Sequence, residues 1–485
     1  MPDKDSDARL ARIPSSIHHI HLIGVAGTAM AALAGMLVER GFRVSGSDNQ
    51  FYEPTASLLR GSRVELKTGF SPGNLDPAPD LVVVGNVVQR VNPEAQALLS
   101  SPVPYLSMSE ALWQFFLKDK QVLMVAGTHG KTTSTAMMAH VLAAAGRDPS
   151  MLVGGVSLDF GSNYRLGRGP HFVIEGDEYD TAFFDKGPKF LHYRATGAIV
   201  TAVEFDHADI YRDLDHVKAS FRALAEQADE SRTLVVCADF PHAIDAVKGS
   251  RATILTFGLG AGQFRAANVQ VGADGAHFDV ERDGKAVARG MHLPIGGRMN
   301  VANALGVFVL LGEFGLSEAE IGGGLKSFKS VARRQQVIGE AGGVTVIDDF
   351  AHHPTAIRVT LQAIAEKYPG RRLLAAFEPR SNTARRNVFQ KEFGSAFAGA
   401  SRVYLGPVYF KDTDPIPPTE RLDTPALVSA IASQGAETFA CASNDEILDR
   451  MVADARVGDV AVFMSNGPFD RLKDRFLEAM QNRAG

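Results

Sequence analysis

The sequence predicts an α/β protein of three domains, each built on a mainly parallel sheet. The chain has 485 residues, and at about 150 residues per domain this length suggests three domains. A short aliphatic run, a polar or glycine-containing turn and an amphipathic stretch recur along the chain, as in βα units. Three separate series of such units begin along the chain, so the sequence excludes a single small fold.

The places where the pattern restarts give the expected domain boundaries. The first series opens with HIHLIGV, the second with QVLMVAG, and the third near Ser330. We therefore expect domains at 1–118, 119–329 and 330–485. Residues 252–295 differ from the rest, because their alternation and their turns ADG and RDG predict antiparallel strands. A last helix is expected from about Asp470.

Composition excludes several classes of protein. Hydrophobic residues make up 45% and charged residues 22% of the chain, and the formal net charge is -5. We expect neither nucleic-acid binding nor membrane insertion, because no general cationic field is present. The uncharged stretch from Leu22 to Val38 contains glycines and a threonine, which favours a strand, a turn and a buried helix. Cys237 and Cys441 are expected as buried thiols in a cytoplasmic protein.

The strongest local signal is the segment AGTHGKTTS, which runs from Ala126 to Ser134 between an apolar strand and an apolar helix. Backbone N–H groups of such a glycine turn, together with a helix N-terminus, bind phosphate oxygens. Lys131 would reach the β and γ phosphates, and Thr132 would ligate Mg²⁺. Val125 stands where the general phosphate-loop pattern has glycine, so the loop is shortened. The predicted ATP-binding residues here are Gly127, Thr128, His129, Gly130, Lys131, Thr132 and Thr133.

Polar side chains follow the next two strands of the predicted sheet. The strand HFVI leads into Glu175, and the strand AIVTAV leads into the segment EFDH, which ends at His207. Ligands of open α/β sheets bind at the carboxyl ends of the strands, so Glu175 is a candidate Mg²⁺ ligand. His207 is either a metal or phosphate contact or a structural histidine. A solvated loop is expected for the remaining acids, Asp177, Glu178, Asp180 and Asp185.

The N-terminal strand is followed by a turn that partly matches a dinucleotide-binding fingerprint. The pattern GxGxxG has Leu22 at its first position, but a glycine turn, a helix start and a later acid are present. These features predict a site for a diphosphate and the polar groups of a nucleoside, with an ordinary tight βα turn as the alternative. The residues concerned are Gly24, Val25, Ala26, Gly27, Thr28 and Asp48.

Further polar groups occur at a helix start and after strands of the third series. Asn300 is expected to cap a helix, with Asn303 one turn later. Two segments, DDFAHHP and EPRSNT, each follow an apolar strand. Arg380 could grip a carboxylate with its two-pronged guanidinium group or form a surface ion pair. The candidate residues of these two segments are Asp349, His352, His353, Arg380, Ser381 and Asn382.

Six segments in this order resemble the Mur ligase family: GVAGTAM, GTHGKTT, EGDEYD, FDHADIY, RMNVANA and DDFAHHPT. The resemblance covers nearly the whole chain, and the shortened loop is this family's own version. It implies a Rossmann-like UDP-binding domain, a central P-loop ATPase-like domain, and a Rossmann-like C-terminal domain that brings the amine substrate.

The resemblance also implies a reaction. ATP would phosphorylate the lactyl carboxylate of UDP-N-acetylmuramate, and an amine would then attack the acyl phosphate. Lys131, Glu175 and His207 would be catalytic, with Mg²⁺ held by Thr132, Glu175 and His207. Asn300 and Asn303 would contact ATP, and the turn at Gly24 would bind UDP. Lys218 lies near the place where some members carry a carbamylated lysine.

Within the family, the segments EYDTAFFDK, KFLHY, EPRSNT and MSNG are more similar to members that add a tripeptide than to members that add L-alanine. The implied amine is L-alanyl-γ-D-glutamyl-meso-diaminopimelate, a murein tripeptide, in murein recycling. The nearest alternative is a UDP-N-acetylmuramate–L-alanine ligase. A dinucleotide-dependent oxidoreductase leaves GTHGKTT unexplained, and a silent nucleotide-binding regulator does not account for Glu175 and His207.

Overall fold

The computed structural model describes residues 4–53, 55–410 and 416–484. Contacts divide the chain into two compact units. The first comprises Met1–Glu204, Asp215–Arg265 and Leu305–Gly324, and the second comprises Phe205–Leu214, Ala266–Ala304 and Leu325–Gly485. Within the described ranges, we find no helix with both the length and the apolar character needed to cross a bilayer.

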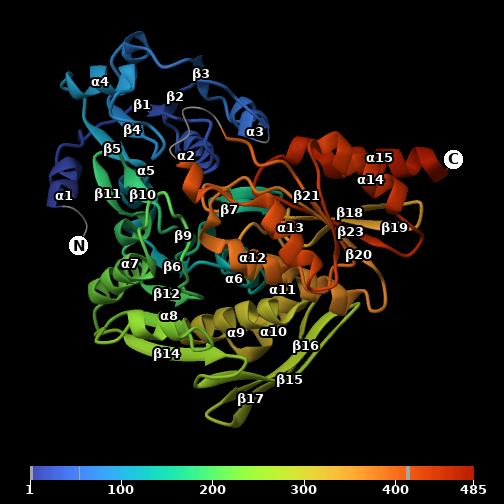
Figure 1. Cartoon of the computed structure of the whole chain (residues 1–485). Helices are drawn as coiled ribbons and strands as arrows, with labels where there is room; N and C mark the ends of the chain where they lie inside the picture. Colours follow the sequence, from blue (N-terminus) through green and yellow to red (C-terminus); the bar gives the residue numbers. More distant parts are fainter. Residues whose placement is uncertain (1–3, 54, 411–415, 485) are drawn as a thin grey trace. The chain divides into compact units, whose positions relative to one another are not determined.

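The first sheet is five-stranded and parallel, in the order β3-β2-β1-β4-β5 (Figure 1). The stretch from Leu22 to Val38 forms the end of β1, a turn and most of the buried helix α2, as the sequence predicts. The elements are α1 (Lys4–Leu10), β1 (His19–Ile23), α2 (Thr28–Glu39), β2 (Arg43–Asp48), α3 (Thr55–Gly61), β3 (Glu65–Thr68), β4 (Leu81–Val84), α4 (Pro93–Leu99), β5 (Tyr105–Ser107) and α5 (Met108–Leu112).

The second sheet has the order β17-β16-β15-β14-β13-β12-β6-β9-β7-β8. Its central strands β13, β12, β6 and β9 are parallel and buried, so their carboxyl ends lie along one edge. Its strands are β6 (Gln121–Ala126), β7 (Ser150–Ser157), β8 (Ser162–Arg165), β9 (His171–Gly176), β12 (Gly197–Val200), β13 (Thr233–Cys237), β14 (Thr253–Gly258), β15 (Phe264–Gly272), β16 (Gly275–Arg282) and β17 (Lys285–Leu293).

The predicted antiparallel region is present in part. Strands β16 and β17 form an antiparallel hairpin, but β14 pairs with β13 and β15 in parallel. The helices of this part of the chain are α6 (Lys131–Ala144), α7 (Leu214–Gln227), α8 (Pro241–Ala246), α9 (Arg298–Glu313) and α10 (Glu318–Ser327), and a small ribbon pairs β10 (Asp180–Ala182) with β11 (Asp185–Pro188).

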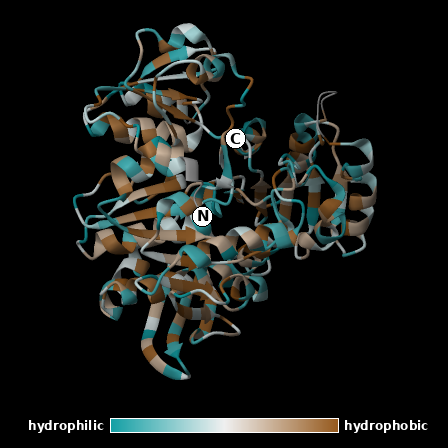
Figure 2. Cartoon of the chain, turned by 90° about the vertical axis from the view of Figure 1, so that its left-hand side faces the viewer, coloured by the Kyte–Doolittle hydropathy of each residue, from teal (hydrophilic) through white to brown (hydrophobic). Residues whose placement is uncertain are grey.

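The third sheet has the order β18-β19-β23-β20-β21-β22 and is parallel except for its edge strand β18. Its apolar strands pack against α11, α12 and α13 on one face and against α14 and α15 on the other. Figure 2 colours the hydrophobic residues of the chain brown. The elements are β18 (Gln336–Ala341), β19 (Val344–Asp349), α11 (Pro354–Lys367), β20 (Leu373–Phe377), α12 (Gln390–Ala396), β21 (Arg402–Leu405), α13 (Thr424–Ala432), β22 (Glu437–Ala440), α14 (Asn444–Asp454), β23 (Val460–Met464) and α15 (Leu472–Ala484).

Two local predictions are corrected. Strand β12 ends at Val200 rather than at Val203, so Glu204 follows an irregular segment and not a strand end. Asn300 is not a helix cap, because α9 begins at Arg298 and the Asn300 side chain donates to the carbonyl of Gly296 at 2.7 Å. The expected burial of both free cysteines is confirmed.

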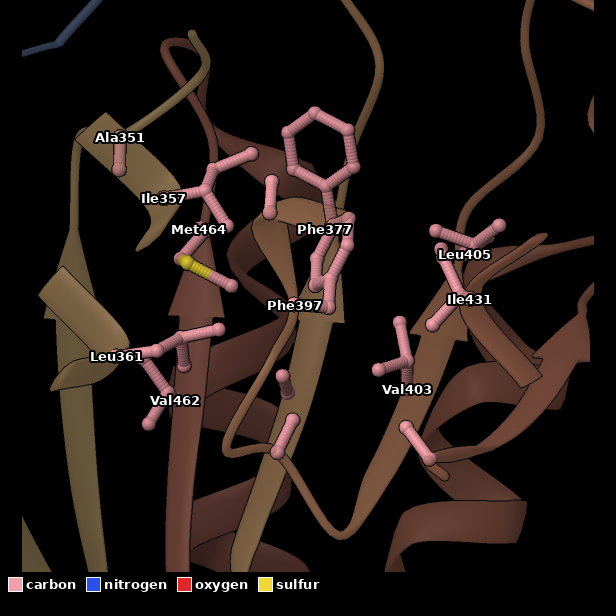
Figure 3. Packing of buried hydrophobic residues seen from close by; sticks show 14 of the residues in the cluster. Ala351, Ile357, Leu361, Phe377, Phe397, Val403, Leu405, Ile431, Val462 and Met464 are labelled. Atoms are coloured by element: carbon pink, nitrogen blue, oxygen red, sulfur yellow. The ribbon is translucent and has the colours of Figure 1, made fainter. Parts of the chain in front are cut away.

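The core on the α11 to α13 side of the third sheet contains a cluster of aromatic rings (Figure 3). Phe377 is fully buried at the end of β20, and its ring centroid lies 5.5 Å from that of Phe393 and 5.6 Å from that of Phe397. Such a residue links the sheet to α12.

We predict that Phe377→Ala lowers the free energy of unfolding of this part of the chain by about 3 to 5 kcal/mol, since a large buried ring leaves a cavity. Denaturant unfolding measures the loss. The control is Val457→Ala, at a side chain 85% exposed, which should change stability little. Equal effects of the two substitutions would contradict this account of the core.

Candidate active site

The turn between β6 and α6 is held against the segment that follows β12. Gly127 has φ 133° and Gly130 has φ 79°, both in regions that favour glycine. A Cβ atom at Gly127 would clash with the Thr201 hydroxyl and approach the Ala202 nitrogen to 2.8 Å. The N–H of Thr128 donates to the Ala202 carbonyl at 2.8 Å, and the Thr201 hydroxyl donates to the His129 carbonyl. The turn is therefore compact and leads directly into the helix.

Lys131 is the first residue of α6 and points back over this turn. Its Nζ atom donates to the Gly127 carbonyl at 2.6 Å and to both carboxylate oxygens of Glu178, at 3.0 and 2.8 Å. Burial alone would lower the pKa of Lys131, but Glu178, Asp177 and Glu175 hold that pKa above its ordinary value. An ammonium group is thus fixed at a helix N-terminus beside three carboxylates.

Thr132 and Glu175 place two oxygen ligands together. The Thr132 hydroxyl donates to Glu175 Oε1 at 2.8 Å, while Glu175 Oε2 accepts from the N–H of Gly154 at 2.7 Å. Burial and the negative charge of Asp177 raise the pKa of Glu175, although Lys131 opposes the rise. A hydroxyl and a buried carboxylate are the oxygen donors that Mg²⁺ prefers, so these residues fit a magnesium ion.

His129 points toward Glu204, two residues beyond Ala202. The His129 Nε2 atom lies 2.7 Å from a carboxylate oxygen of Glu204. The N–H of Glu204 donates to the Thr128 hydroxyl at 2.9 Å, so the turn and the segment after β12 are joined by side-chain as well as backbone bonds. Thr201 and Glu204, which sequence reasoning left outside the candidate residues, therefore help to shape this turn.

The acidic loop after β9 is less exposed than expected. Glu178 is only 3% exposed and pairs with Lys131, and Asp185 is buried with His192 Nε2 at 2.9 Å. The prediction of a solvated loop is wrong for these two residues: Lys131 compensates the charge of Glu178, and Asp185 lies 3.9 Å from the Arg9 guanidinium group as well as beside His192. Asp180 follows the prediction better, since it pairs with the exposed Lys186.

The N-terminal turn has the geometry expected of a close-approach βα turn. Gly24 has φ 84°, and the N–H groups of Gly24 and Val25 both donate to the Ser47 carbonyl. Helix α2 begins at Thr28, after Ala26 and Gly27. Asp48 accepts from the N–H of Ala26 at 3.0 Å, so one of its oxygens already supports the turn.

A buried polar network beneath this turn was not anticipated. Glu94 is fully buried and lies 2.6 Å from His21 Nε2, while its oxygens also accept from Ser47 and Asn74. These polar residues are far apart in the chain, so no local sequence pattern predicts that they form a cluster. It joins β1, β2 and α4 below the predicted UDP-binding turn.

In the second unit, the segment that contains His207 packs on loops of the third sheet. His207 has φ 54°, and its N–H donates to Asp206 Oδ1 at 2.7 Å. The N–H of Ala208 donates to the Thr383 hydroxyl at 3.2 Å. Asn382 donates to a carboxylate oxygen of Asp209 at 3.1 Å. The structure thus places His207 among the predicted peptide-binding residues.

Asp206 lies at the centre of this cluster, beside His207, His352 and His353. His353 donates from Nε2 to the Phe205 carbonyl at 3.2 Å and accepts at Nδ1 from the N–H of Thr355, where it caps α11. Burial alone would raise the pKa of Asp206, but the charges of His207, His352 and His353 hold it below its ordinary value. Burial lowers the pKa of His352 despite the opposite effect of Asp206.

Asp349 and Arg380 differ in their surroundings. Asp349 accepts from the backbone N–H groups of Gln335 and Ala351, and burial raises its pKa. This carboxyl group organises the loop after β19. Arg380 is 53% exposed and lies 3.5 Å from Glu378, and its side chain passes over Gly467, where a Cβ atom would clash with it.

The remaining candidates have local roles. The Ser381 hydroxyl accepts from the N–H of Ala384, and Asn303 donates to Asn300 at 3.3 Å. Thr133 is buried in the first turn of α6. Lys218 lies between Asp215 and Asp245, and its hydrogen bond to Asp245, followed by that of Lys248, lowers the Asp245 pKa to about 2.

Comparison with protein families identifies the class of protein. The description "Mur ligase family, catalytic domain" matches residues 19–119, "Mur ligase middle domain" matches 125–311, and "Mur ligase, glutamate ligase domain" matches 333–467. With a relative 35% identical over 96% of the chain, these matches show that the chain belongs to the Mur ligase family. Members of this family are ATP-dependent ligases that form amide bonds, and the chain is an enzyme of this kind.

Individual relatives are similar over their whole length. UDP-N-acetylmuramate–L-alanyl-γ-D-glutamyl-meso-2,6-diaminoheptandioate ligase of Haemophilus influenzae is 35% identical over 96% of this chain and 99% of its own. A UDP-N-acetylmuramate–L-alanine ligase of Rhizobium johnstonii is 33% identical over 94% of this chain and 95% of its own. The crystal structure of a murein peptide ligase of Psychrobacter arcticus has a TM-score of 0.72 and 32% identity, with 96% and 99% of the two chains covered.

We predict that Lys131→Met abolishes most ATP-dependent ligase activity. The substitution keeps an aliphatic side chain but removes the ammonium group beside the helix N-terminus. Loss of one such contact typically costs about 3 to 4 kcal/mol of transition-state stabilisation, or about a hundredfold to a thousandfold in rate. Phosphate release and the melting temperature are measured together, because Glu178 loses its partner. A folded variant with activity within threefold of the unsubstituted enzyme would remove Lys131 from the nucleotide site.

Proposed function

We propose that this enzyme joins the murein tripeptide L-alanyl-γ-D-glutamyl-meso-diaminopimelate to UDP-N-acetylmuramate in murein recycling. The full-length similarity to the Haemophilus influenzae ligase, which carries these substrates in its name, is the observation on which the proposal rests. The arrangement of Lys131, Thr132 and Glu175 supports it, because it suits phosphoryl transfer from ATP.

In the proposed reaction, the lactyl carboxylate of UDP-N-acetylmuramate attacks the γ-phosphate of ATP and ADP departs. The tripeptide amine then attacks the acyl phosphate, and phosphate leaves as the amide bond forms. The first step brings a carboxylate toward a polyanion, so it needs positive charge. Lys131 supplies that charge once the phosphates compete with Glu178 for its ammonium group, and the turn at Gly127 offers backbone N–H donors.

The proposed metal is Mg²⁺, which ATP-dependent members of this family generally use. Thr132 and Glu175 fit a first magnesium ion, since their oxygens already face each other. We assign His207 to a second ion. When bound, magnesium would neutralise phosphate charge. Burial disfavours the charged form of Glu175, and a cation beside it would stabilise that carboxylate.

We assign the remaining candidates to individual substrates. The turn from Gly24 to Thr28 would bind UDP together with Asp48. Asn300 and Asn303 would contact ATP, as would residues 127–133. Asp349, His352, His353, Arg380, Ser381 and Asn382 would bind the peptide or support its site. We retain 1–118, 119–329 and 330–485 as the segments that carry UDP, ATP and peptide recognition.

Within the third segment, an exposed cation would bind the peptide directly, and the buried residues would support the site. The tripeptide carries several carboxylates and L-alanine carries one. Arg380 is half exposed at the carboxyl edge of the third sheet, so its guanidinium group is available to a second carboxylate. Both carboxylate oxygens of Asp349 already accept from backbone N–H groups, so Asp349 would act through the shape of its loop.

An L-alanine-adding ligase is the second candidate, favoured by the 33% identity to the Rhizobium johnstonii enzyme. The two functions share ATP and UDP-N-acetylmuramate and differ only in the amine. The test supplies both nucleotides with either the tripeptide or L-alanine and follows phosphate release. A kcat/KM at least tenfold higher for the tripeptide supports the proposal, and preference for L-alanine would replace it with the alternative.

We predict that Glu175→Gln raises the Mg²⁺ concentration needed for half-maximal activity, because an amide oxygen is a weaker ligand than a carboxylate. Glutamine can still accept from Gly154, so the fold should be kept. Asp180→Asn is the matched control in β10, the next strand along the chain, where the carboxylate pairs with Lys186. Equal magnesium midpoints for the two variants would exclude Glu175 as a ligand.

We predict that Arg380→Ala raises the KM for the tripeptide more than fivefold and leaves the KM values for ATP and UDP-N-acetylmuramate nearly unchanged. Arg380→Lys should recover part of the loss, because a point charge cannot replace a two-pronged contact. The control is Arg450→Ala, which removes an arginine that pairs with Glu446 on α14. A lower melting temperature with an unchanged tripeptide KM would assign Arg380 to the internal pair with Glu378 instead.

A further inference from the structure

The turn ADG and the hairpin that follows it bring three metal-ligand side chains together outside the residues assigned to the reaction. Asp274 lies just before β16, His277 is in β16, and His292 is in β17. One potential ligand atom from each lies within 4.8 Å of the other two. All three belong to the second compact unit.

Strand register explains why these residues meet. His277 is the direct cross-strand partner of His292, so both imidazoles stand on the same face of the hairpin. Their rings are stacked, with centroids 4.5 Å apart and planes inclined by 8°. Gly275 has φ 116°, and a side chain there would collide with the Leu293 carbonyl, so the turn brings Asp274 close to the histidine pair.

Both imidazoles direct the same nitrogen toward Asp274. His277 Nε2 lies 2.9 Å from the Asp274 carboxylate, and His292 Nε2 lies 3.1 Å from the Asp274 carbonyl. With Nε2 protonated, each ring donates to oxygen. If the proton moves to the Nδ1 atom, each Nε2 presents a lone pair to the same small volume, beside a carboxylate.

We propose that Asp274, His277 and His292 form a binding site for a late first-row divalent cation such as Zn²⁺, and that the ion links β16 to β17. Two imidazole nitrogens and one carboxylate oxygen are donors of the type found in zinc sites with three protein ligands. Zinc lies roughly 2.0 to 2.2 Å from each nitrogen or oxygen ligand, so three ligand atoms within 4.8 Å of one another can surround one ion after small side-chain rotations.

The surroundings permit that movement and leave room for water. The side chains of His277 and Asp274 are 46% and 71% exposed, so they can adjust their rotamers without disturbing a packed core. Water would complete the coordination. Magnesium prefers oxygen ligands, so millimolar Mg²⁺ should not displace zinc from a site with two imidazoles.

The test is a zinc titration of the full chain in millimolar Mg²⁺, with a chelating dye as competitor. The unsubstituted chain should bind one Zn²⁺ ion more than the double variant His277→Ala with His292→Ala. A second double variant, His18→Ala with His242→Ala, removes two exposed histidines elsewhere and should keep the ion. Equal zinc stoichiometry in the unsubstituted chain and the His277/His292 variant would overturn the site.

Two further measurements separate binding from folding. Asp274→Asn keeps the size of the side chain and should weaken zinc binding at least tenfold, with a melting temperature close to that of the unsubstituted chain in the absence of zinc. Added Zn²⁺ should raise the melting temperature of the unsubstituted chain and of the His18/His242 control, but not that of the His277/His292 variant. Zinc binding without such a rise would overturn the link between the two strands. Ligase activity with Mg²⁺ should be unchanged in the His277/His292 variant.

Discussion

The close approach of Gly127 to the Thr201 hydroxyl and the Ala202 backbone is the constraint on which the turn between β6 and α6 depends. A side chain at residue 127 would collide with that backbone, and the turn could then not bond to the Ala202 carbonyl. Because the contact fixes where α6 begins, it also fixes Lys131 and Thr132 at the first two helical positions. Glycine is required here by both space and backbone angle.

Charge compensation is the second theme of this site. Lys131 and Glu178 are buried together, and each makes the charge of the other tolerable, while Lys131 also opposes the rise in the pKa of Glu175. An ion pair of this kind holds the ammonium group in place, while a nucleotide that brings its own phosphates would substitute for Glu178. Asp185 is also buried beside a cation, because it lies 3.9 Å from the Arg9 guanidinium group, and its other neighbour is His192 Nε2 at 2.9 Å.

The second unit has its own organising feature, the segment from Phe205 to Asp209. It bonds to the cap of α11 through His353 and to the loop after β20 through Asn382 and Thr383. A histidine assigned to metal binding and residues assigned to peptide binding are thereby parts of one hydrogen-bonded cluster. A change at His352 or His353 would alter the environment of His207, because all three histidines lower the pKa of Asp206.

The sequence by itself determined the parallel sheets, the glycine turn and the strand-end position of Glu175, because these follow from local periodicity and from residues adjacent in the chain. It did not reveal the burial of Glu178, the Glu94 network, or the place of Asn300 inside α9. Only the tertiary structure decided the burial of Glu178 and the Glu94 network, since each depends on partners far away in the chain, whereas the start of α9 at Arg298 is a local boundary that the sequence pattern placed too late. His277 and His292 also meet only in the tertiary structure. The register between β16 and β17 places one imidazole opposite the other, and the sequence of either strand alone does not determine that register.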